Sequence, residues 1–461
     1  MRSLNEVMAS RHMAVIGASR DPLKPGSLLL KLLEDTGYEG KVAGVNPAGG
    51  EVNGIRLYPS VFDVPFDIDL AVLIIPPAFV PEAVADCARK GARGVVITSE
   101  GFGESGEEGR RHQEAVSEIL KETGMRAFGP NTLGIVNTET GLTTSYFADE
   151  RMLRRGSIGF AAQSGIFVGA LLRYLASFDG LHISKGIGLG NKVDVNECDA
   201  LDFFSDDAQT KTIGIYLEDV RDGNRFIESA KRAARRKPVL VLKGGRTRQG
   251  ARATASHTAS LAVDDAVFDG ALRQAGVLRM DGVADMLATL MGFEWMPLPR
   301  GNRIAVATFS GAQAIMSIDA AMGEGLGMAE FSPETNERLS RVISFPSKMQ
   351  NPIDLFPDMM THGFEKTSCE ILKALLDDDG VQGIVFIGFA MLGEDMFRPM
   401  AEVIRGNPIK PVFVSLLGGR EDMAAAEDFL RKERIPVVPF PETAIEVFAR
   451  MWRYVQMNRL R

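Results

Sequence analysis

The chain has 461 residues, enough for about three domains of ordinary size. Hydrophobic residues make up 45% of the sequence and charged residues 24%, which is typical of a globular protein with a substantial core. The formal net charge of −8 argues against a nucleic-acid-binding surface. No apolar segment approaches the length that spans a membrane, and the first residues lack the apolar run and cleavage site of a signal peptide.

The three cysteines, Cys87, Cys198 and Cys369, lie far apart in the sequence and form no Cys/His cluster. Neither a disulfide framework nor a metal site is therefore expected. Unpaired thiols fit a reducing, cytoplasmic location.

Residues 1–128 alternate short apolar runs with longer amphipathic segments. Strands are predicted within residues 12–19, 41–47, 70–77, 94–102 and 125–131, and helices within 81–91 and 107–124. Strands rich in β-branched residues that alternate with helices predict βαβ units and a parallel sheet, here a Rossmann-like domain. Ligands of such sheets bind beyond the carboxyl ends of the strands.

The pattern restarts at residue 129. Strands are predicted within residues 156–165, 183–191, 212–220 and 238–245, with helices within 199–207 and 223–236. Two prolines and a charged turn in 294–303 predict a linker, so the second domain is placed at 129–298 and a third at 299–461. In the third domain we expect a strand, a Ser-Gly turn and a helix within 303–325, strands within 383–390, 411–419 and 435–440, and a closing helix at 443–460.

Glycine-rich turns follow several of the predicted strands. In "VIGASRDPLKPG", Gly17 and Ser19 would let the backbone approach a phosphate closely. The turn is not GxGxxG, so the dinucleotide fingerprint is not satisfied. Each turn taken singly can be a tight βα connection, but together they suggest a phosphate-bearing ligand on the first domain.

Two Ser-Gly turns begin helices in different domains, one at Gln163, Ser164 and Gly165 and the other at Ser310, Gly311 and Ala312. The free N–H groups of a helix N-terminus favour an anion, so the two turns could hold one phosphoryl group between them. The alternative is glycine retained for close packing of strand and helix.

His257 lies in "RTRQGARATASHTASLAVDD", a stretch of small polar residues that predicts a mobile loop. A histidine at the tip of such a loop could take up a phosphoryl group at one place and deliver it at another. Glu218, at the end of a predicted strand, could bond one ring nitrogen and free the other to attack. A solvated histidine and a solvated strand-end carboxylate are the simpler alternatives.

The motifs "ASRDPLKPG", "GPNTLG", "YLE", "SHTASL" and "NPIDL" occur in one order along the chain. These motifs and their order resemble those of the NDP-forming acyl-CoA synthetases. This superfamily includes succinyl-CoA synthetase and ADP-forming acetyl-CoA synthetase, and the resemblance is to its α-subunit-like portion. The resemblance covers essentially the whole chain. It implies an α/β protein with a Rossmann-like CoA-binding domain followed by two flavodoxin-like domains.

The resemblance also implies roles for matching residues. His257 would carry the phosphoryl group, Glu218 would orient it, and the two Ser-Gly turns would hold the phosphate. Asn191 and Asp194 of "GNKVD" would lie near the reaction centre. The CoA cleft would comprise Gly17, Ser19, Arg20, Lys24, Asn46, Pro47, Ile75, Pro76, Ser99, Glu100, Gly101 and Asn131.

The implied reaction converts a carboxylic acid, CoA and ATP into acyl-CoA, ADP and phosphate through phospho-His257 and an acyl phosphate. No ATP-grasp domain is recognised, so ATP and Mg²⁺ are expected on a separate β subunit or on a fused C-terminal domain. An oligomer is expected, with no nucleic-acid or membrane partner.

Two other functions are alternatives to this hypothesis. A non-catalytic CoA-sensing or scaffold module of a protein acyltransferase would need neither His257 nor Glu218. A Rossmann oxidoreductase is disfavoured because GxGxxG is missing and the second strand ends "VAGVNP", without an acidic residue.

The sequence does not name the acid, and acetate, branched and aromatic acids stay open. Small residues at Ala162 and Gly165 would leave room for a bulky acyl group. The family's usual glycines after "SHT" and "SLA" are here Ala259 and Val263.

Overall fold

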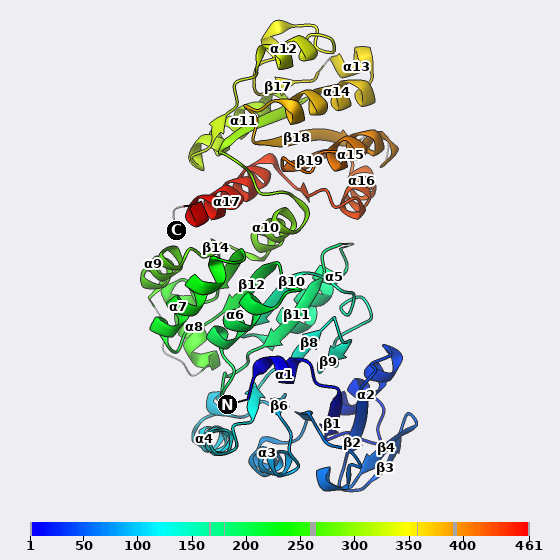
Figure 1. The fold of residues 1–461 in the computed structure, drawn as a ribbon, viewed down its shortest axis with the longest axis vertical. Helices are drawn as coiled ribbons and strands as arrows, with labels where there is room; N and C mark the ends of the chain where they lie inside the picture. Colours follow the sequence, from blue (N-terminus) through cyan, green and yellow to red (C-terminus); the bar gives the residue numbers. More distant parts are fainter. Residues whose placement is uncertain are drawn as a thin grey trace. The chain divides into compact units, whose positions relative to one another are not determined.

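The computed structural model describes residues 2–165, 167–178, 180–258, 264–356, 358–390 and 394–459, without the side chains of residues 168, 255–258, 394 and 395. The chain forms two compact units. The first comprises residues 1–177 with 181–280, and the second comprises 178–180 with 281–461. Figure 1 shows two sheets in the first unit and one in the second.

The first sheet has seven strands in the order β3-β4-β2-β1-β5-β6-β7. Its strands are β1 (His12–Ile16), β2 (Lys41–Val45), β3 (Gly50–Val52), β4 (Ile55–Tyr58), β5 (Leu70–Leu73), β6 (Gly94–Ile97) and β7 (Arg126–Phe128). Helices α1 (Leu4–Met8), α2 (Pro25–Asp35), α3 (Val80–Arg89) and α4 (Glu107–Thr123) accompany it. All pairings are parallel except the hairpin β3-β4, where Asn53 and Gly54 supply the positive φ values of 49° and 77° that a two-residue turn requires.

The second sheet has the order β14-β13-β12-β10-β11-β8-β9. Its strands are β8 (Ile135–Asn137), β9 (Leu142–Thr143), β10 (Ile158–Ala162), β11 (Ile183–Gly188), β12 (Thr212–Leu217), β13 (Val239–Lys243) and β14 (Leu278–Met280). β8 runs antiparallel to β11 and β9, and the other pairings are parallel. Helices on this sheet include α5 (Leu172–Ala176), α6 (Glu197–Asp206), α7 (Gly223–Ala234) and α9 (Asp265–Ala275). Strands β10, β11 and β13 are buried along their whole length because helices cover both faces.

The stretch that contains His257 is helical where it is described. α8 extends over Arg248–Thr258, so the prediction of a loop is wrong for these residues. Alanine and arginine favour a helix, and the hydroxyl of Thr247 accepts a hydrogen bond from the amide of Gly250 at 3.0 Å in the first turn. The remainder of the predicted loop, residues 259–263, lies outside the described residues.

The third sheet has the order β16-β15-β18-β19-β20, and β17 pairs with β15. Its strands are β15 (Arg303–Thr308), β16 (Gly327–Met328), β17 (Ile353–Asp354), β18 (Gly383–Ala390), β19 (Val412–Gly418) and β20 (Val437–Val438). The helices of this unit are α10 (Val283–Trp295), α11 (Gly311–Gly323), α12 (Pro333–Leu339), α13 (Asp358–His362), α14 (Phe364–Asp377), α15 (Arg398–Arg405), α16 (Arg420–Lys432) and α17 (Pro441–Arg459). The predicted α/β class with parallel sheets is confirmed.

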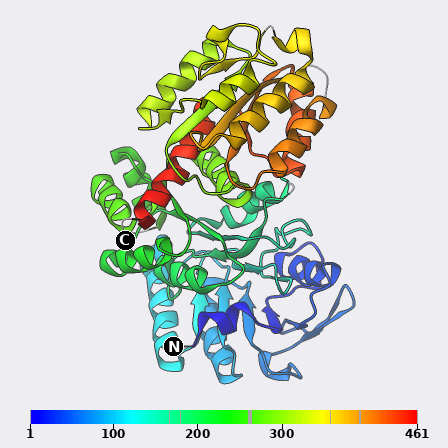
Figure 2. The same cartoon turned by 45° about the horizontal axis from the view of Figure 1, so that its top comes forward.

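Helix α10 belongs to the second unit. It packs against α17, the red helix in Figure 2, and Arg450 of α17 forms an ion pair with Asp285 of α10 at 2.5 Å. At Gly292 a side chain would meet Val447 of α17, so the two helices approach closely there. None of the described helices is long and apolar enough to cross a bilayer.

Candidate active site

A cavity of about 440 Å³ lies at the carboxyl ends of β1, β2 and β5 in the first unit. This volume suits a small-molecule site. Four residues predicted from the sequence for the CoA cleft line it, namely Gly17, Pro47, Ile75 and Pro76. The topology brings them together because parallel strands place their following turns at one edge of the sheet.

Hydrogen bonds link the turn after β1 to the turn after β2. The guanidinium of Arg20 donates hydrogen bonds to the carbonyls of Ala48 at 2.6 Å and Gly49 at 3.0 Å, and the amide of Asn46 donates to the carbonyl of Ala18 at 2.7 Å. Arg20 and Asn46 therefore hold the shape of the cleft. Ser19 and Lys24 belong to the same turn and the start of α2.

Gly17 occupies the closest point between turn and sheet. Its φ is +96°, and a Cβ there would lie 2.1 Å from the carbonyl oxygen of Ile74. Only glycine fits this position, and its predicted use for the approach of a phosphate stays a prediction.

A second cavity, of about 540 Å³, lies between the first and second sheets of the same unit. Eight residues predicted from the sequence line it: Ser99, Glu100, Asn131, Gln163, Ser164, Gly165, Asn191 and Glu218. The cavity therefore joins the far end of the expected CoA cleft to the expected phosphate-binding turn and to the carboxylate proposed to orient His257.

Gln163 connects β10 to β12 at this cavity. Its side-chain oxygen accepts hydrogen bonds from the amides of Glu218 at 2.9 Å and Asp219 at 3.2 Å, and its amide nitrogen donates to a carboxylate oxygen of Asp219 at 2.5 Å. The side-chain amide is thus fixed in one orientation. The Gln163 side chain therefore holds in place the end of β12, which Glu218 directly follows.

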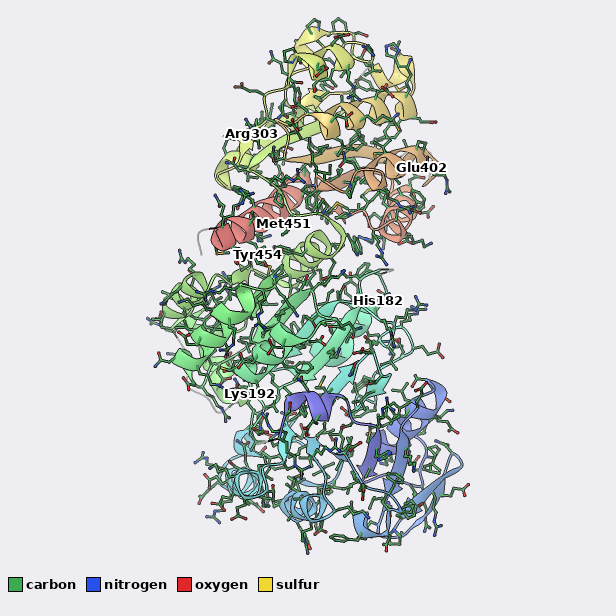
Figure 3. All side chains as sticks on the ribbon, viewed as in Figure 1. His182, Lys192, Arg303, Glu402, Met451 and Tyr454 are labelled. Carbon is green, nitrogen blue, oxygen red and sulfur yellow. The ribbon has the colours of Figure 1, made fainter. Side chains whose placement is uncertain are left out.

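Asp219 is in turn paired with Lys192. The Lys192 ammonium lies 2.6 Å from the Asp219 carboxylate and 3.0 Å from that of Glu197, and the side chains of Lys192 and Glu197 are each only 1% exposed. Burial raises the pKa of the Asp219 carboxyl, but the Lys192 ammonium and the Gln163 amide outweigh it and hold this pKa below its ordinary value. Lys192 is labelled in Figure 3, at the end of the second sheet nearest the first.

Glu218 is buried, and one of its carboxylate oxygens accepts a hydrogen bond from the Tyr216 hydroxyl at 3.3 Å. Burial, followed by the Glu218 charge, raises the pKa of Tyr216, so this hydroxyl stays a donor. The Tyr216 ring stacks on Phe167 with centroids 4.1 Å apart. The Tyr216 hydroxyl, whose ring is held by stacking on Phe167, thus holds the Glu218 carboxylate at the cavity.

Asn191 contacts the first domain through Glu104. Its amide donates to the Glu104 carboxylate and, at 3.2 Å, to Gln113. The same carboxylate accepts the amides of Gly101 at 2.7 Å and Phe102 at 3.1 Å. Burial raises the pKa of Glu104, but these donors outweigh it and lower the pKa. Gly101, predicted for the CoA cleft, lines neither cavity, and its amide is bound to the Glu104 carboxylate.

Asp194 is not one of the described residues that line this cavity. Its carboxylate accepts hydrogen bonds from the Arg126 guanidinium and the Ala127 amide, both at 2.8 Å. The structure gives it a contact with β7, so the "GNKVD" motif divides between Asn191 at the cavity and Asp194 at the sheet.

His257 lies in the last turn of α8, and its side chain is outside the described residues. The helix starts beside the end of β13, where Gly245 (φ +71°) lies against Thr254 of α8, and it also lies against the short helix Gly103–Ser105 of the first domain. The role of His257 at the cavity stays a prediction.

Ser310, Gly311 and Ala312 lie in the second unit. Ser310 is the N-cap of α11, and its hydroxyl accepts a hydrogen bond from the amide of Gln313 at 3.4 Å. The predicted helix start is confirmed, and its use as a phosphate site stays a prediction.

Several residues at the cavity were missed from the sequence. Leu133, Tyr146 and Phe147 line it from irregular segments after β7 and β9. Lys192 and Asp219 lie in motifs that were noticed, but their pairing joins positions 27 apart along the chain. A lysine inside "GNKVD" and a second acid after "YLE" were the available signals.

Two family models match consecutive parts of the chain. A CoA binding domain matches residues 11–138, and a succinyl-CoA ligase like flavodoxin domain matches residues 155–293. The first covers the cleft of about 440 Å³, and the second covers Gln163, Lys192, Glu218 and His257.

Similar proteins include the acetate–CoA ligase (ADP-forming) II of Archaeoglobus fulgidus, which is 36% identical over 98% of this chain and 67% of the relative. The α subunit of acetate–CoA ligase (ADP-forming) II of Pyrococcus furiosus is 35% identical over 97% of this chain and 96% of the subunit. This chain thus spans nearly all of an α subunit and about two thirds of a single-chain ligase.

Among solved structures, acetyl-coenzyme A synthetase 1 of Ca. Korarchaeum cryptofilum, in complex with phosphate and ADP, superposes with a TM-score of 0.92 at 31% identity. The match covers 100% of this chain and 98% of the other. The domains, the order of the motifs and the shared fold agree, and the chain belongs to the family of NDP-forming acyl-CoA synthetases as an α-subunit-like, CoA-binding member.

Proposed function

We propose that this chain carries the CoA-binding and phosphohistidine steps of an ADP-forming acid–CoA ligation. In this reaction an acid, CoA and ATP give acyl-CoA, ADP and phosphate. The observation that carries the proposal is the cavity of about 540 Å³, where residues expected to bind CoA meet Gln163–Gly165 and Glu218.

The steps are assigned to this chain's residues as follows. His257 accepts the phosphoryl group of ATP and passes it to the carboxylate of the acid, which forms an acyl phosphate. The CoA thiol then attacks the acyl carbon and releases phosphate. Glu218 orients the imidazole, and the turn Gln163–Gly165 stabilises the phosphate.

The chain's second task is to keep water from the acyl phosphate, which water would otherwise hydrolyse. Two side chains that line the cavity are fixed by hydrogen bonds: Asn191 by Glu104, and Gln163 by Asp219, which pairs with the buried Lys192. Fixed groups at this place supply orientation without reorganising during the reaction.

We further propose that ATP and Mg²⁺ bind an ATP-grasp part, either a β subunit or a fused C-terminal domain. The relatives support a partner of this kind, since one is an α subunit and another is a longer single chain. We assign residues 1–128 to CoA binding and the residues from 129 to the start of α10 to the phosphohistidine domain. The second flavodoxin-like domain begins at residue 281 and not at 299, because α10 belongs to the second unit.

The test combines the chain with an ATP-grasp subunit, ATP, Mg²⁺, CoA and a panel of acids, acetate first because two relatives are acetate ligases by name. We expect ADP and acyl-CoA in equal amounts, and a loss of at least about 1,000-fold in His257→Asn with CoA affinity unchanged. Tight CoA binding without turnover on any acid would favour the CoA-sensing module instead.

A further inference from the structure

The cavity of about 540 Å³ has one wall that the phosphoryl and CoA chemistry does not use. It is formed by Leu133, Tyr146 and Phe147. The rings of Tyr146 and Phe147 lie against each other with centroids 4.7 Å apart, and Phe147 is 51% exposed. A half-exposed phenylalanine beside a tyrosine in a concave site is an apolar surface that is ready to pack against a ligand.

The segment that begins at Gly165 packs directly against Leu133 of this wall, and glycines allow the close approach. A Cβ at Gly165 would lie 3.7 Å from Leu133 Cγ, in ordinary contact. A Cβ at Gly169 would lie 2.7 Å from Leu133 Cδ1 and 3.7 Å from Phe147 Cβ. Ala162, which the sequence suggested as room for an acyl group, is fully buried in β10, so of the two only Gly165 lines the cavity.

The remaining walls carry charge and hydrogen-bonding groups. Ser99, Glu100 and Asn131 lie on the side assigned to CoA, while Ser164 and Glu218 lie on the side assigned to the phosphoryl group. The carboxyl carbon of the acid must reach both the phosphoryl group and the thiol. Leu133, Tyr146 and Phe147 carry the large apolar side chains of the cavity, so an apolar side group of the acid would pack against them.

Charge also selects among acids at this cavity. Glu100 and Glu218 both line it, and a second carboxylate on the acid would be repelled by them. Burial, followed by the Glu100 charge, raises the pKa of Tyr146, so its ring stays neutral. The site disfavours dicarboxylic acids and favours an uncharged side group.

We propose that Leu133, Tyr146 and Phe147 form the acyl-binding pocket. This pocket selects monocarboxylic acids whose side group is apolar and larger than methyl. An aromatic ring, which can pack against Phe147, fits best. The inference rests on the proposed function and adds the substrate class to it.

The experiment measures kcat/KM of the complete enzyme for acetate, isobutyrate, phenylacetate and succinate. For the wild type we expect phenylacetate to exceed acetate by about tenfold, and no turnover of succinate. Phe147→Ala should lower kcat/KM for phenylacetate about tenfold or more and for acetate less than about threefold, because only the larger side group loses its contact. Phe147→Leu, which keeps apolar volume, should recover part of the loss.

Phe62→Ala is the matched control, since Phe62 is 47% exposed but lines neither cavity. It should leave all ratios between acids unchanged. Equal losses for acetate and phenylacetate in Phe147→Ala, or a wild type that prefers succinate, would overturn the pocket while leaving the ligase function intact. Absence of turnover on every acid with CoA bound would instead overturn the proposed function and the pocket with it.

Discussion

Replacing Lys192 by methionine is expected to destabilise the first unit by about 3–5 kcal/mol, the cost of leaving buried charges without their partner. The ammonium lies within 3.0 Å of both Asp219 and Glu197, and all three side chains are almost completely buried. Thermal unfolding should show the midpoint lowered by about 10 °C. Methionine keeps the length and apolar stem of lysine, so the loss reports the charge.

Lys31→Met is the control for this variant. Lys31 forms an ion pair with Asp35 at 2.9 Å, but both side chains are about half exposed. Exposed pairs of this kind contribute little to stability because water and salt screen them. If Lys192→Met unfolded no earlier than Lys31→Met, the buried network would not support the site.

The same pair gives a pH dependence. The folded state holds the pKa of Asp219 below its ordinary value of 3.8. The pair therefore stabilises the fold fully above that pH, and its contribution is lost as the pH falls through the lower pKa of the folded state. The difference in unfolding free energy between wild type and Lys192→Met should be constant near neutral pH and should shrink as the pH falls through the pKa of Asp219 in the variant, which burial raises above 3.8 once Lys192 is removed.

Replacing Glu218 by glutamine is expected to slow phosphoryl transfer through His257 by about 100-fold, the usual contribution of an oriented acid–base partner. Glutamine keeps the shape of the side chain but removes the charge that stabilises a protonated imidazole. CoA affinity should change less than about twofold, because Glu218 lies on the phosphoryl side of the cavity. Rapid-quench measurement of the phosphoenzyme gives the rate.

Two matched variants separate this role from packing. Tyr216→Phe removes the hydroxyl that donates to Glu218 and should slow the step by much less than Glu218→Gln. Glu139→Gln changes a half-exposed carboxylate that pairs with Lys185 on β11 and should leave the step unchanged. Equal rates for Glu218→Gln and wild type would remove Glu218 from the mechanism.

Most of the central strands could be predicted from the sequence because they are fully buried apolar runs that end at glycine or a small polar residue. The short antiparallel strands could not, since β8 and β9 have too few residues to show alternation. The β3-β4 hairpin was missed, although Asn53–Gly54 was its signal. α8 was taken for a loop because its small residues outweighed its helix-forming alanines and arginines.

The part of the candidate site that could be predicted from the sequence is the part that follows from the strand topology. Within each sheet the turns gather at one edge because the strands are parallel, those after β1 and β5 in the first sheet and those after β10 and β12 in the second. The buried pairing of Lys192 with Asp219 depends on the left-handed backbone of Lys192, with φ +56°, which the sequence pattern did not reveal. Phe147 lies in an irregular segment whose direction no local pattern fixes.

The most direct test of the phosphohistidine mechanism uses the full chain with an acyl-CoA and labelled phosphate, without nucleotide. Phosphate attacks the thioester to give acyl phosphate and free CoA, and His257 then takes the phosphoryl group and releases the acid. The account predicts acid-labile, base-stable label on the wild type, none on His257→Asn, and discharge of the label by acid plus CoA. An unlabelled wild type that still binds CoA, or label that persists in His257→Asn, would contradict it.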